Sequence, residues 1–266
     1  MSPRRVGAMI LRYVYLHKRS LPRTFEIVFW PVMELLLWGF VSVYLRRLTG
    51  DALADLAGAL ISAMIFWDIL YRSQQGVSIS FVEDIWTQNI VNLLVSPLRL
   101  VEWITATFVY GLLKTTLIVL ILTVIAGALY HFYLLNTLSF YFLPLVFNLL
   151  LFGWALGIFT SSLVIRWGHS AEALIWGVPF LIQPFSAIFY PLHVLPGPMR
   201  AVSSLLPSTY VFEGMRAVIR TGRMPMGYFW AGLALNLVYF ALAGAFFRWM
   251  FLQARSTGRL GRLGTD

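Results

Sequence analysis

Hydrophobic residues gather in six long runs along the chain, and the stretches between them carry most of the charge. The runs cover residues 27–44, 56–71, 104–130, 138–165, 171–190 and 228–251. A helix needs about 20 predominantly apolar residues to cross a bilayer. Lipid offers the backbone no hydrogen-bond partners, so runs of this length are expected to be helical. The pattern predicts an all-α integral membrane protein with six transmembrane helices.

Composition agrees with this class. Of the 266 residues, 59% are hydrophobic and 12% are charged, whereas an average soluble domain is about 25% charged. No internal repeat or low-complexity stretch divides the chain, so we expect residues 1–266 to form one transmembrane domain. Lys and Arg concentrate beside the two termini, including a basic tail at 253–266, which predicts that both termini are cytoplasmic. The net charge of +9 is then explained by orientation and by contact with membrane lipids, and no nucleic-acid partner is expected.

The segment 1–23 has the pattern of an amphipathic helix. Arg5, Arg12 and Arg19 recur every seven residues on one arc. The opposite arc is apolar and comprises Val6, Met9, Ile10, Tyr13 and Leu16. We expect a helix in the cytoplasmic interface with its arginines directed toward lipid phosphates. A disordered basic tail is the alternative.

The cytoplasmic connection 72–103 also has an amphipathic pattern. One helical face is mostly apolar and comprises Ile79, Val82, Ile85, Trp86, Asn89 and Ile90, while Glu83, Asp84 and Gln88 lie toward the other face. We expect a surface helix that ends near Ser96-Pro97. Its acidic side chains would be poor lipid anchors, which favours docking of a cytoplasmic partner over a simple membrane-surface connector.

Three charged residues fall inside the apolar runs: Glu34, Asp68 and Lys114. Ionisable groups at such positions are costly and usually face a partner or a water-filled cavity. They indicate either the polar lining of a transport path or an internal ion pair that holds helices together. The numerous tryptophans fit interfacial belts, although some could line a path for an amphiphile. Gly153 and Gly157 permit close approach of a neighbouring helix.

The segment 188–227 has four prolines in its first part, Pro191, Pro196, Pro198 and Pro207, yet much of it is apolar. Proline interrupts helices, so a full span is excluded here. With both termini cytoplasmic, the segment lies on the outer side before the last run. We expect an outer re-entrant helical hairpin that caps the exit of the path, because irregular backbone at that depth must be buried in protein or face a cavity.

Several catalytic motifs are absent from the sequence. Neither lysine follows a glycine, so there is no G-x-x-x-x-G-K-[ST] phosphate loop, and H-E-x-x-H and G-x-S-x-G are missing too. The four histidines are scattered and there is no cysteine. We therefore expect a transport subunit that has no nucleotide site, metal site or other cofactor of its own and is not an enzyme.

Three segments resemble the permease subunits of type-2 ABC exporters, which move polysaccharides, glycolipids, lipo-oligosaccharides and some drugs. Glu83, Trp86, Ser96 and Pro97 are similar to the family's E-x-x-W…sP pattern. The stretch FYPL at 189–192 with Leu195-Pro196 resembles its "ffPl…lP". The stretch LPSTY at 206–210 with Glu213 and Arg216 resembles its "lnPlty…e..R", although Ser208 departs from the usual small apolar residue.

The resemblance implies a permease homodimer in a bacterial cytoplasmic (inner) membrane, with two copies of a separate ATPase that binds ATP and Mg²⁺. The first, second and fifth spans would line the substrate path at the dimer interface. The implied ATPase-coupling residues are Glu83, Asp84, Trp86, Gln88, Asn89, Arg166, His169 and Glu172. Candidate path residues are Glu34, Asp68, Lys114 and Gln183. The outer gate would include Tyr190, Pro191, Pro196, Pro207, Tyr210, Glu213 and Arg216.

The favoured hypothesis is thus an ATP-driven exporter subunit that moves an amphiphilic, glycan-type or lipid-type substrate outward. A stand-alone secondary transporter or channel using Glu34, Asp68 and Lys114 is an alternative, although the inverted repeats typical of such proteins are not visible. An integral-membrane lipid enzyme is a third possibility, for which clustered catalytic acids or histidines would be expected.

Overall fold

The computed structural model describes residues 1–49, 54–87 and 89–256, and every regular element within these ranges is a helix. The α-helices are α1 (Pro3–Lys18), α2 (Leu21–Thr49), α3 (Ala54–Trp86), α4 (Ile90–Val95), α5 (Leu100–Tyr130), α6 (Leu134–Leu138), α7 (Phe142–Trp167), α8 (Glu172–Ile182), α9 (Gly197–Ser204), α10 (Pro207–Thr221) and α11 (Met226–Ser256). Short 3-10 turns lie at Ser139–Tyr141, Gly168–Ala171, Gln183–Phe185 and Leu192–Val194. The predicted all-α class is confirmed for the described residues.

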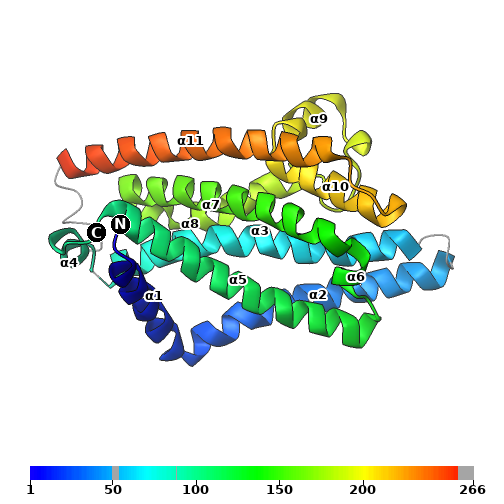
Figure 1. The fold of residues 1–266 in the computed structure, drawn as a ribbon, viewed down its shortest axis with the longest axis horizontal. Helices are drawn as coiled ribbons and strands as arrows, with labels where there is room; N and C mark the ends of the chain where they lie inside the picture. The colour runs from blue at the N-terminus through cyan, green and yellow to red at the C-terminus, as the bar shows by residue number, and fades with distance from the viewer. Residues whose placement is uncertain (50–53, 88, 257–266) are drawn as a thin grey trace.

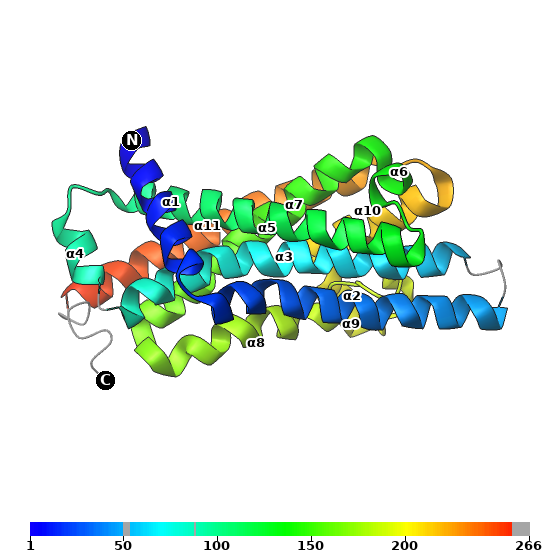
Figure 2. The ribbon, with the colours of Figure 1, turned by 90° about the horizontal axis from the view of Figure 1, so that it is seen from below.

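The long helices α2, α3, α5, α7 and α11 run lengthwise beside one another (Figure 1). Helix α1 crosses one end of this bundle, where α3 and α7 also end, and α9 and α10 lie toward the opposite end (Figures 1 and 2). Helices α3 and α7 make the two largest contributions to the buried hydrophobic core. We call the end with α1 the inner end and the other the outer end, following the charge-based orientation.

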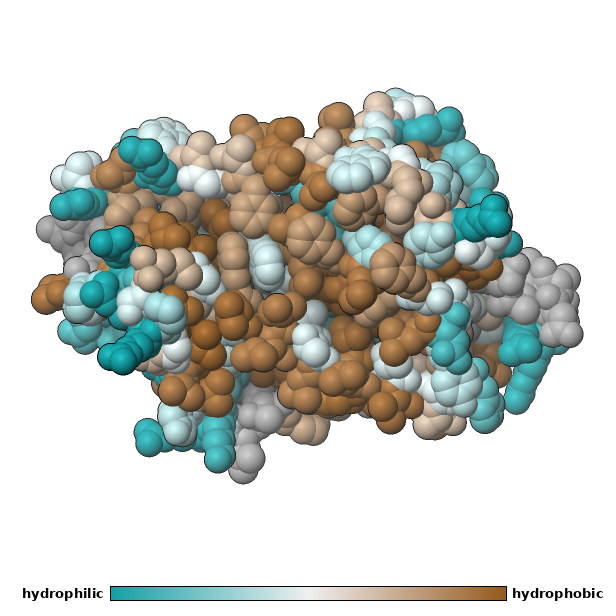
Figure 3. Space-filling model, in the orientation of Figure 1, coloured by the Kyte–Doolittle hydropathy of each residue, from teal (hydrophilic) through white to brown (hydrophobic). Residues whose placement is uncertain are grey.

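The exterior of the bundle is apolar between its two ends. Figure 3 shows a broad hydrophobic band with hydrophilic side chains gathered at both ends. Exposed apolar side chains on the long helices include Leu37, Phe40, Leu117, Leu120, Val124, Leu237 and Leu242. Such a band is the surface that a hydrocarbon layer requires. The protein is therefore an integral membrane protein.

Five helical segments in the described ranges are long and apolar enough to cross a membrane. They are Ile27–Leu48, Leu56–Trp86, Leu100–Tyr130, Leu134–Trp167 and Met226–Ser256. The predicted sixth span, 171–190, is not confirmed, because α8 ends at Ile182 after 11 residues. A 3-10 turn follows, and Ala187 adopts a left-handed conformation with φ of 51°. Pro184 accounts for the break, since proline lacks an N–H and disfavours helix at the residue before it.

Helix α3 extends beyond the predicted end of the second span. The sequence pattern placed the end of the second span near Tyr71, but α3 continues as one helix to Trp86. Polar residues in this part of α3 form bonds inside the bundle: the side-chain amide of Gln74 donates to Ser78 Oγ at 3.0 Å, to Thr160 Oγ1 at 3.1 Å and to the carbonyl of Ile175 at 3.2 Å. Glu83 and Asp84 are buried. The expectation of a surface helix with these two carboxylates facing outward is therefore wrong.

Glycines allow α3 to lie close to two neighbours. A Cβ on Gly153 of α7 would lie 1.7 Å from Ser73 Oγ, and one on Gly157 would lie 2.7 Å from Val77 Cβ. On the other side of α3, a Cβ on Gly76 would lie 2.5 Å from Gly111 Cα in α5. The predicted close approach at Gly153 and Gly157 is confirmed, and it explains how α3 is packed between α5 and α7.

Helix α1 is attached to the bundle by charged groups. Arg12 Nη1 lies 2.5 Å from Asp84 Oδ1, and Arg5 Nη1 donates to the Pro97 carbonyl at 2.6 Å and lies 3.5 Å from Glu102 Oε2. The predicted direction of these two arginines, toward lipid phosphates, is therefore wrong: both meet protein acceptors. The apolar arc is buried as expected at Val6, Met9 and Tyr13.

A replacement of Gly153 by alanine tests the packing of α3 against α7. We expect Gly153→Ala to lower stability by about 1–3 kcal/mol, because the added methyl group has no room. Gly244→Ala is the matched control, since Gly244 also lies in a long helix and a Cβ there meets nothing within 4 Å. The measurement is the apparent Tm of both purified variants in one detergent. Equal Tm losses would contradict the close α3–α7 contact.

A replacement of Arg12 tests the attachment of α1. Arg12→Leu leaves the buried Asp84 carboxylate without its cation, so we expect a loss of about 2–4 kcal/mol, moderated because the Arg12 side chain is 27% exposed. Arg4→Leu, on the exposed side of the same helix, should have little effect. Backbone hydrogen exchange across residues 3–18 should become faster in Arg12→Leu but not in Arg4→Leu. Unchanged exchange in Arg12→Leu would show that the ion pair does not hold α1.

Candidate functional site

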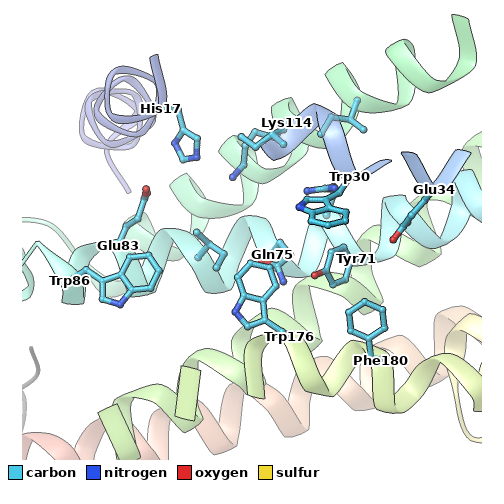
Figure 4. Close-up of a pocket in the computed structure, with 14 residues that line it drawn as sticks. His17, Trp30, Glu34, Tyr71, Gln75, Glu83, Trp86, Lys114, Trp176 and Phe180 are labelled. Atoms are coloured by element: carbon cyan, nitrogen blue, oxygen red, sulfur yellow. The ribbon is translucent and has the colours of Figure 1, made fainter. Parts of the chain in front are cut away.

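A cavity of about 580 Å³ lies among helices α1, α2, α3, α5 and α8. Its size is within the range of about 300–1,000 Å³ that is typical of small-molecule sites. Figure 4 shows the side chains that line it. They are His17, Ile27, Trp30, Glu34, Tyr71, Arg72, Gln75, Ile79, Glu83, Trp86, Lys114, Ile118, Trp176 and Phe180. The cavity thus combines an aromatic wall with several ionisable groups.

Helical spacing brings these side chains to one space. Residues four apart lie on the same face of a helix, and α3 contributes Tyr71, Gln75, Ile79 and Glu83 in this register. Helices α2, α5 and α8 repeat the same spacing over a shorter length, and α1 contributes His17. The pairs are Trp30 with Glu34 on α2, Lys114 with Ile118 on α5, and Trp176 with Phe180 on α8. The lining on α3 extends from Tyr71 to Trp86, which corresponds to about 22 Å along the helix.

The ionisable groups occupy different parts of the cavity. In Figure 4, Glu83 and His17 lie at one end, Glu34 lies at the other, and Lys114 extends between them. Arg72 Nε donates to Asp68 Oδ1 at 3.1 Å. Lys114 Nζ lies 4.8 Å from the centre of the Tyr110 ring, a distance suited to a cation–π contact. Two of the four predicted path residues, Glu34 and Lys114, therefore line one cavity.

The other two predicted path residues do not line this cavity. Asp68 is buried and pairs with the cavity residue Arg72 at 3.1 Å. Gln183 begins the 3-10 turn after α8. For Asp68 the structure supports the interpretation of an internal ion pair, because Arg72 lies one helical turn away and supplies the compensating charge.

The predicted coupling residues are split between buried and exposed positions at the inner end. Trp86 Nε1 donates to Glu172 Oε1 at 2.6 Å, which joins the end of α3 to the start of α8. Asn89 precedes α4, and Arg166 lies in the last turn of α7. Glu83 and Asp84 are buried, as noted above. Gln88 and the side chain of His169 lie outside the described residues.

Asp84 forms a compact polar cluster that the sequence did not reveal. Tyr13 Oη donates to Asp84 Oδ2 at 3.0 Å, and Trp103 Nε1 donates to the same oxygen at 3.1 Å. Burial, together with the nearby Asp84 carboxylate, raises the pKa of Tyr13 well above its ordinary value. Its hydroxyl therefore stays protonated and able to donate. The cluster connects α1, α3 and α5.

The segment predicted as an outer hairpin contains α9 and α10, held to the preceding chain by two charged residues. Arg216 donates to the carbonyls of Ala187 at 2.6 Å and Ile188 at 3.0 Å, and to Glu213 Oε1 at 2.8 Å. The same Glu213 oxygen accepts from the backbone N–H of Leu192 at 2.7 Å. Burial lowers the pKa of Arg216, opposed by Glu213, but a guanidinium remains charged. These bonds join α10 to residues 187–192.

The remaining predicted gate residues terminate or fix short elements. Pro196 and Pro207 stand at the starts of α9 and α10, and Pro191 precedes the 3-10 turn at Leu192–Val194. Tyr190 Oη donates to the Pro184 carbonyl, and Tyr210 Oη donates to the Ser204 carbonyl at 2.9 Å. The segment is therefore a pair of helices, as expected, while its entry into the membrane stays a prediction.

The chain matches a protein-family model. The model of the "ABC-2 type transporter" family matches residues 16–220, well over half of the chain. The matched range contains every residue that lines the cavity, together with Glu213 and Arg216. No curated protein matches the chain. The family is one of membrane permeases that work with an ABC ATPase and generally have no ATPase site of their own. This chain belongs to the ABC-2 type transporter family and is the membrane permease of an ABC transporter.

Proposed function

We propose that this permease exports an amphiphilic, glycan-type or lipid-type substrate across a bacterial cytoplasmic membrane. Two permeases would form a homodimer, and two separate ATPase subunits would bind ATP and Mg²⁺ and drive the movement. The observation that carries the proposal is the cavity, which combines an aromatic wall with charged groups inside the region matched by the family. Such a lining accommodates a molecule with an apolar body and a polar group.

The position of the cavity supports outward movement. Its lining begins at Trp86, the last residue of α3, at the inner end of the bundle. The concentration of Lys and Arg beside the termini favours a cytoplasmic location for this end. A substrate entering beside α1 and α3 would therefore come from the cytoplasm or the inner leaflet. Helices α9 and α10 lie toward the opposite end, where a gate for release is required.

Exposed groups at the inner end supply a surface for the ATPase. Trp86, Val95 and Trp167 are exposed apolar side chains at the ends of α3, α4 and α7, and Figure 2 places these ends together. Apolar side chains in contact with water commonly mark a protein interface. Since Glu83 and Asp84 are buried, we propose that α4 and the turn after α7 carry the direct contacts, and that Glu83 and Asp84 act through the packing of α3.

A single charge on α4 tests this interface. Val95 is 83% exposed, and Val95→Glu should abolish association with the ATPase because a carboxylate would be desolvated at the contact. Val202→Glu on α9, where the native side chain is 47% exposed at the opposite end, is the matched control. ATP hydrolysis is measured on complexes that are purified from native membranes by an affinity tag on the permease.

If no ATPase co-purifies with the wild-type chain, the exporter proposal fails. Equal hydrolysis with both variants would exclude α4 from the interface.

The Glu213–Arg216 pair would hold the outer gate closed. Arg216→Gln removes a charged donor from the Ala187 and Ile188 carbonyls, and each such bond contributes about 1.5–3 kcal/mol. We expect faster hydrogen exchange in residues 186–192, with no change in α5. Arg220→Gln, at an exposed position one turn further along α10, is the control and should leave exchange unchanged. Unaltered exchange in Arg216→Gln would contradict the proposed latch.

A further inference from the structure

We propose that the cavity binds organic cations, which are held between the Glu34 carboxylate and an aromatic wall formed by Trp30, Tyr71 and Phe180. The inference rests on the proposed function only in treating the bound cation as cargo. The binding itself is argued from the charges and rings of the cavity.

Among the described residues, the charged groups in and beside the cavity leave one acid in excess, since Glu34, Glu83 and Asp68 stand against Arg72 and Lys114. Arg72 is engaged by Asp68 at 3.1 Å. Lys114 lies over the Tyr110 ring at 4.8 Å, and the opposite charge of Glu83 acts on it. Within the described residues, Glu34 has neither a salt bridge nor a hydrogen bond. A carboxylate among apolar groups without a counter-charge is costly, and a cationic ligand would supply that charge.

Aromatic rings surround the same end of the cavity. In Figure 4 the Glu34 carboxylate is directed toward the side where Trp30, Tyr71 and Phe180 lie. The Tyr71 and Phe180 rings are 5.7 Å apart, at an angle of 54°. Ring faces carry negative electrostatic potential and attract cations, most strongly when water is excluded. The carboxylate and the rings therefore favour the same sign of charge.

The chemistry of this end favours a cation over an anion or a neutral sugar. An anion would be repelled by Glu34, and the two cations of the cavity are already balanced by acids of the protein. A neutral glycan could stack on the tryptophans but would leave the Glu34 charge uncompensated. Apolar groups such as Ile27 and Ile118 also line the cavity. The ligand that fits is a compact organic cation with an apolar or aromatic body.

Binding of a matched ion pair tests the inference. The probe is radiolabelled tetraphenylphosphonium, and the comparison is tetraphenylborate, which has the same shape and the opposite charge. Both are measured by equilibrium binding to the full chain in lipid nanodiscs, with binding to empty nanodiscs subtracted. We expect saturable binding of the cation at one site per chain and no saturable binding of the anion.

Substitutions then locate the site. Glu34→Gln should weaken cation binding by at least about tenfold, with the apparent Tm unchanged. Trp30→Leu should weaken it by about threefold to tenfold, since one ring is lost. Trp249→Leu on α11 is the matched control, because Trp249 and Trp30 are 55% and 56% exposed, but Trp249 does not line the cavity. It should change affinity by less than about twofold.

Three results would overturn the inference. The first two are an unchanged cation affinity in Glu34→Gln and saturable binding of the anion equal to that of the cation. The third is displacement of the bound probe by maltoheptaose but not by unlabelled cation, because that result would indicate a sugar site. Val95→Glu separates this inference from the exporter proposal, since it should retain cation binding after ATPase association is lost. If the chain binds the cation in a Glu34-dependent way but never associates with an ATPase, the cation site is supported and the exporter proposal is rejected.

Discussion

The contact of α3 with α7 and α5 is the constraint on which the rest of the molecule depends. Lipid does not drive helices together through the hydrophobic effect, so association relies on close packing and on polar contacts between helices. The glycines at 76, 111, 153 and 157 allow this approach. Gln74, Ser78 and Thr160 then form a hydrogen-bonded group across it. Because α3 is fixed on these two sides, its remaining face, from Tyr71 to Glu83, can line a cavity without collapsing onto a neighbour.

The same helix connects the cavity with the inner end. Asp84 is held by Arg12, Tyr13 and Trp103, and Trp86 is bonded to Glu172 on α8. These contacts lie beside the last cavity residues of α3, Glu83 and Trp86. A displacement of the inner end of α3 would therefore carry α1 and α8 with it, and these helices contribute other walls of the cavity. A mechanical connection between an ATPase subunit and the cavity requires bonds of this kind to be already in place.

Predictions from the sequence were accurate for helices that face lipid and less accurate for helix faces that pack against the rest of the protein. Runs exposed to lipid must be apolar, so the spans beginning near 27, 104 and 228 were found. The inner part of α3 was misplaced because its polar side chains bond inside the bundle, and pattern alone cannot separate such a face from one in water. Glu34 and Lys114 were singled out by their charge. Their meeting in one cavity, and the partners of Arg5 and Arg12, depend on helix rotation, which a single sequence does not determine.

The shortness of α8 has a consequence for the thickness of the membrane that the protein fits. Eleven residues of helix extend about 16 Å, roughly half of a hydrocarbon layer of about 30 Å. The remaining depth on this side is taken up by the turn at 183–185 and the chain around Ala187. Backbone of this kind cannot face lipid tails. Unless a second permease covers this face, the bilayer beside α8 must thin locally.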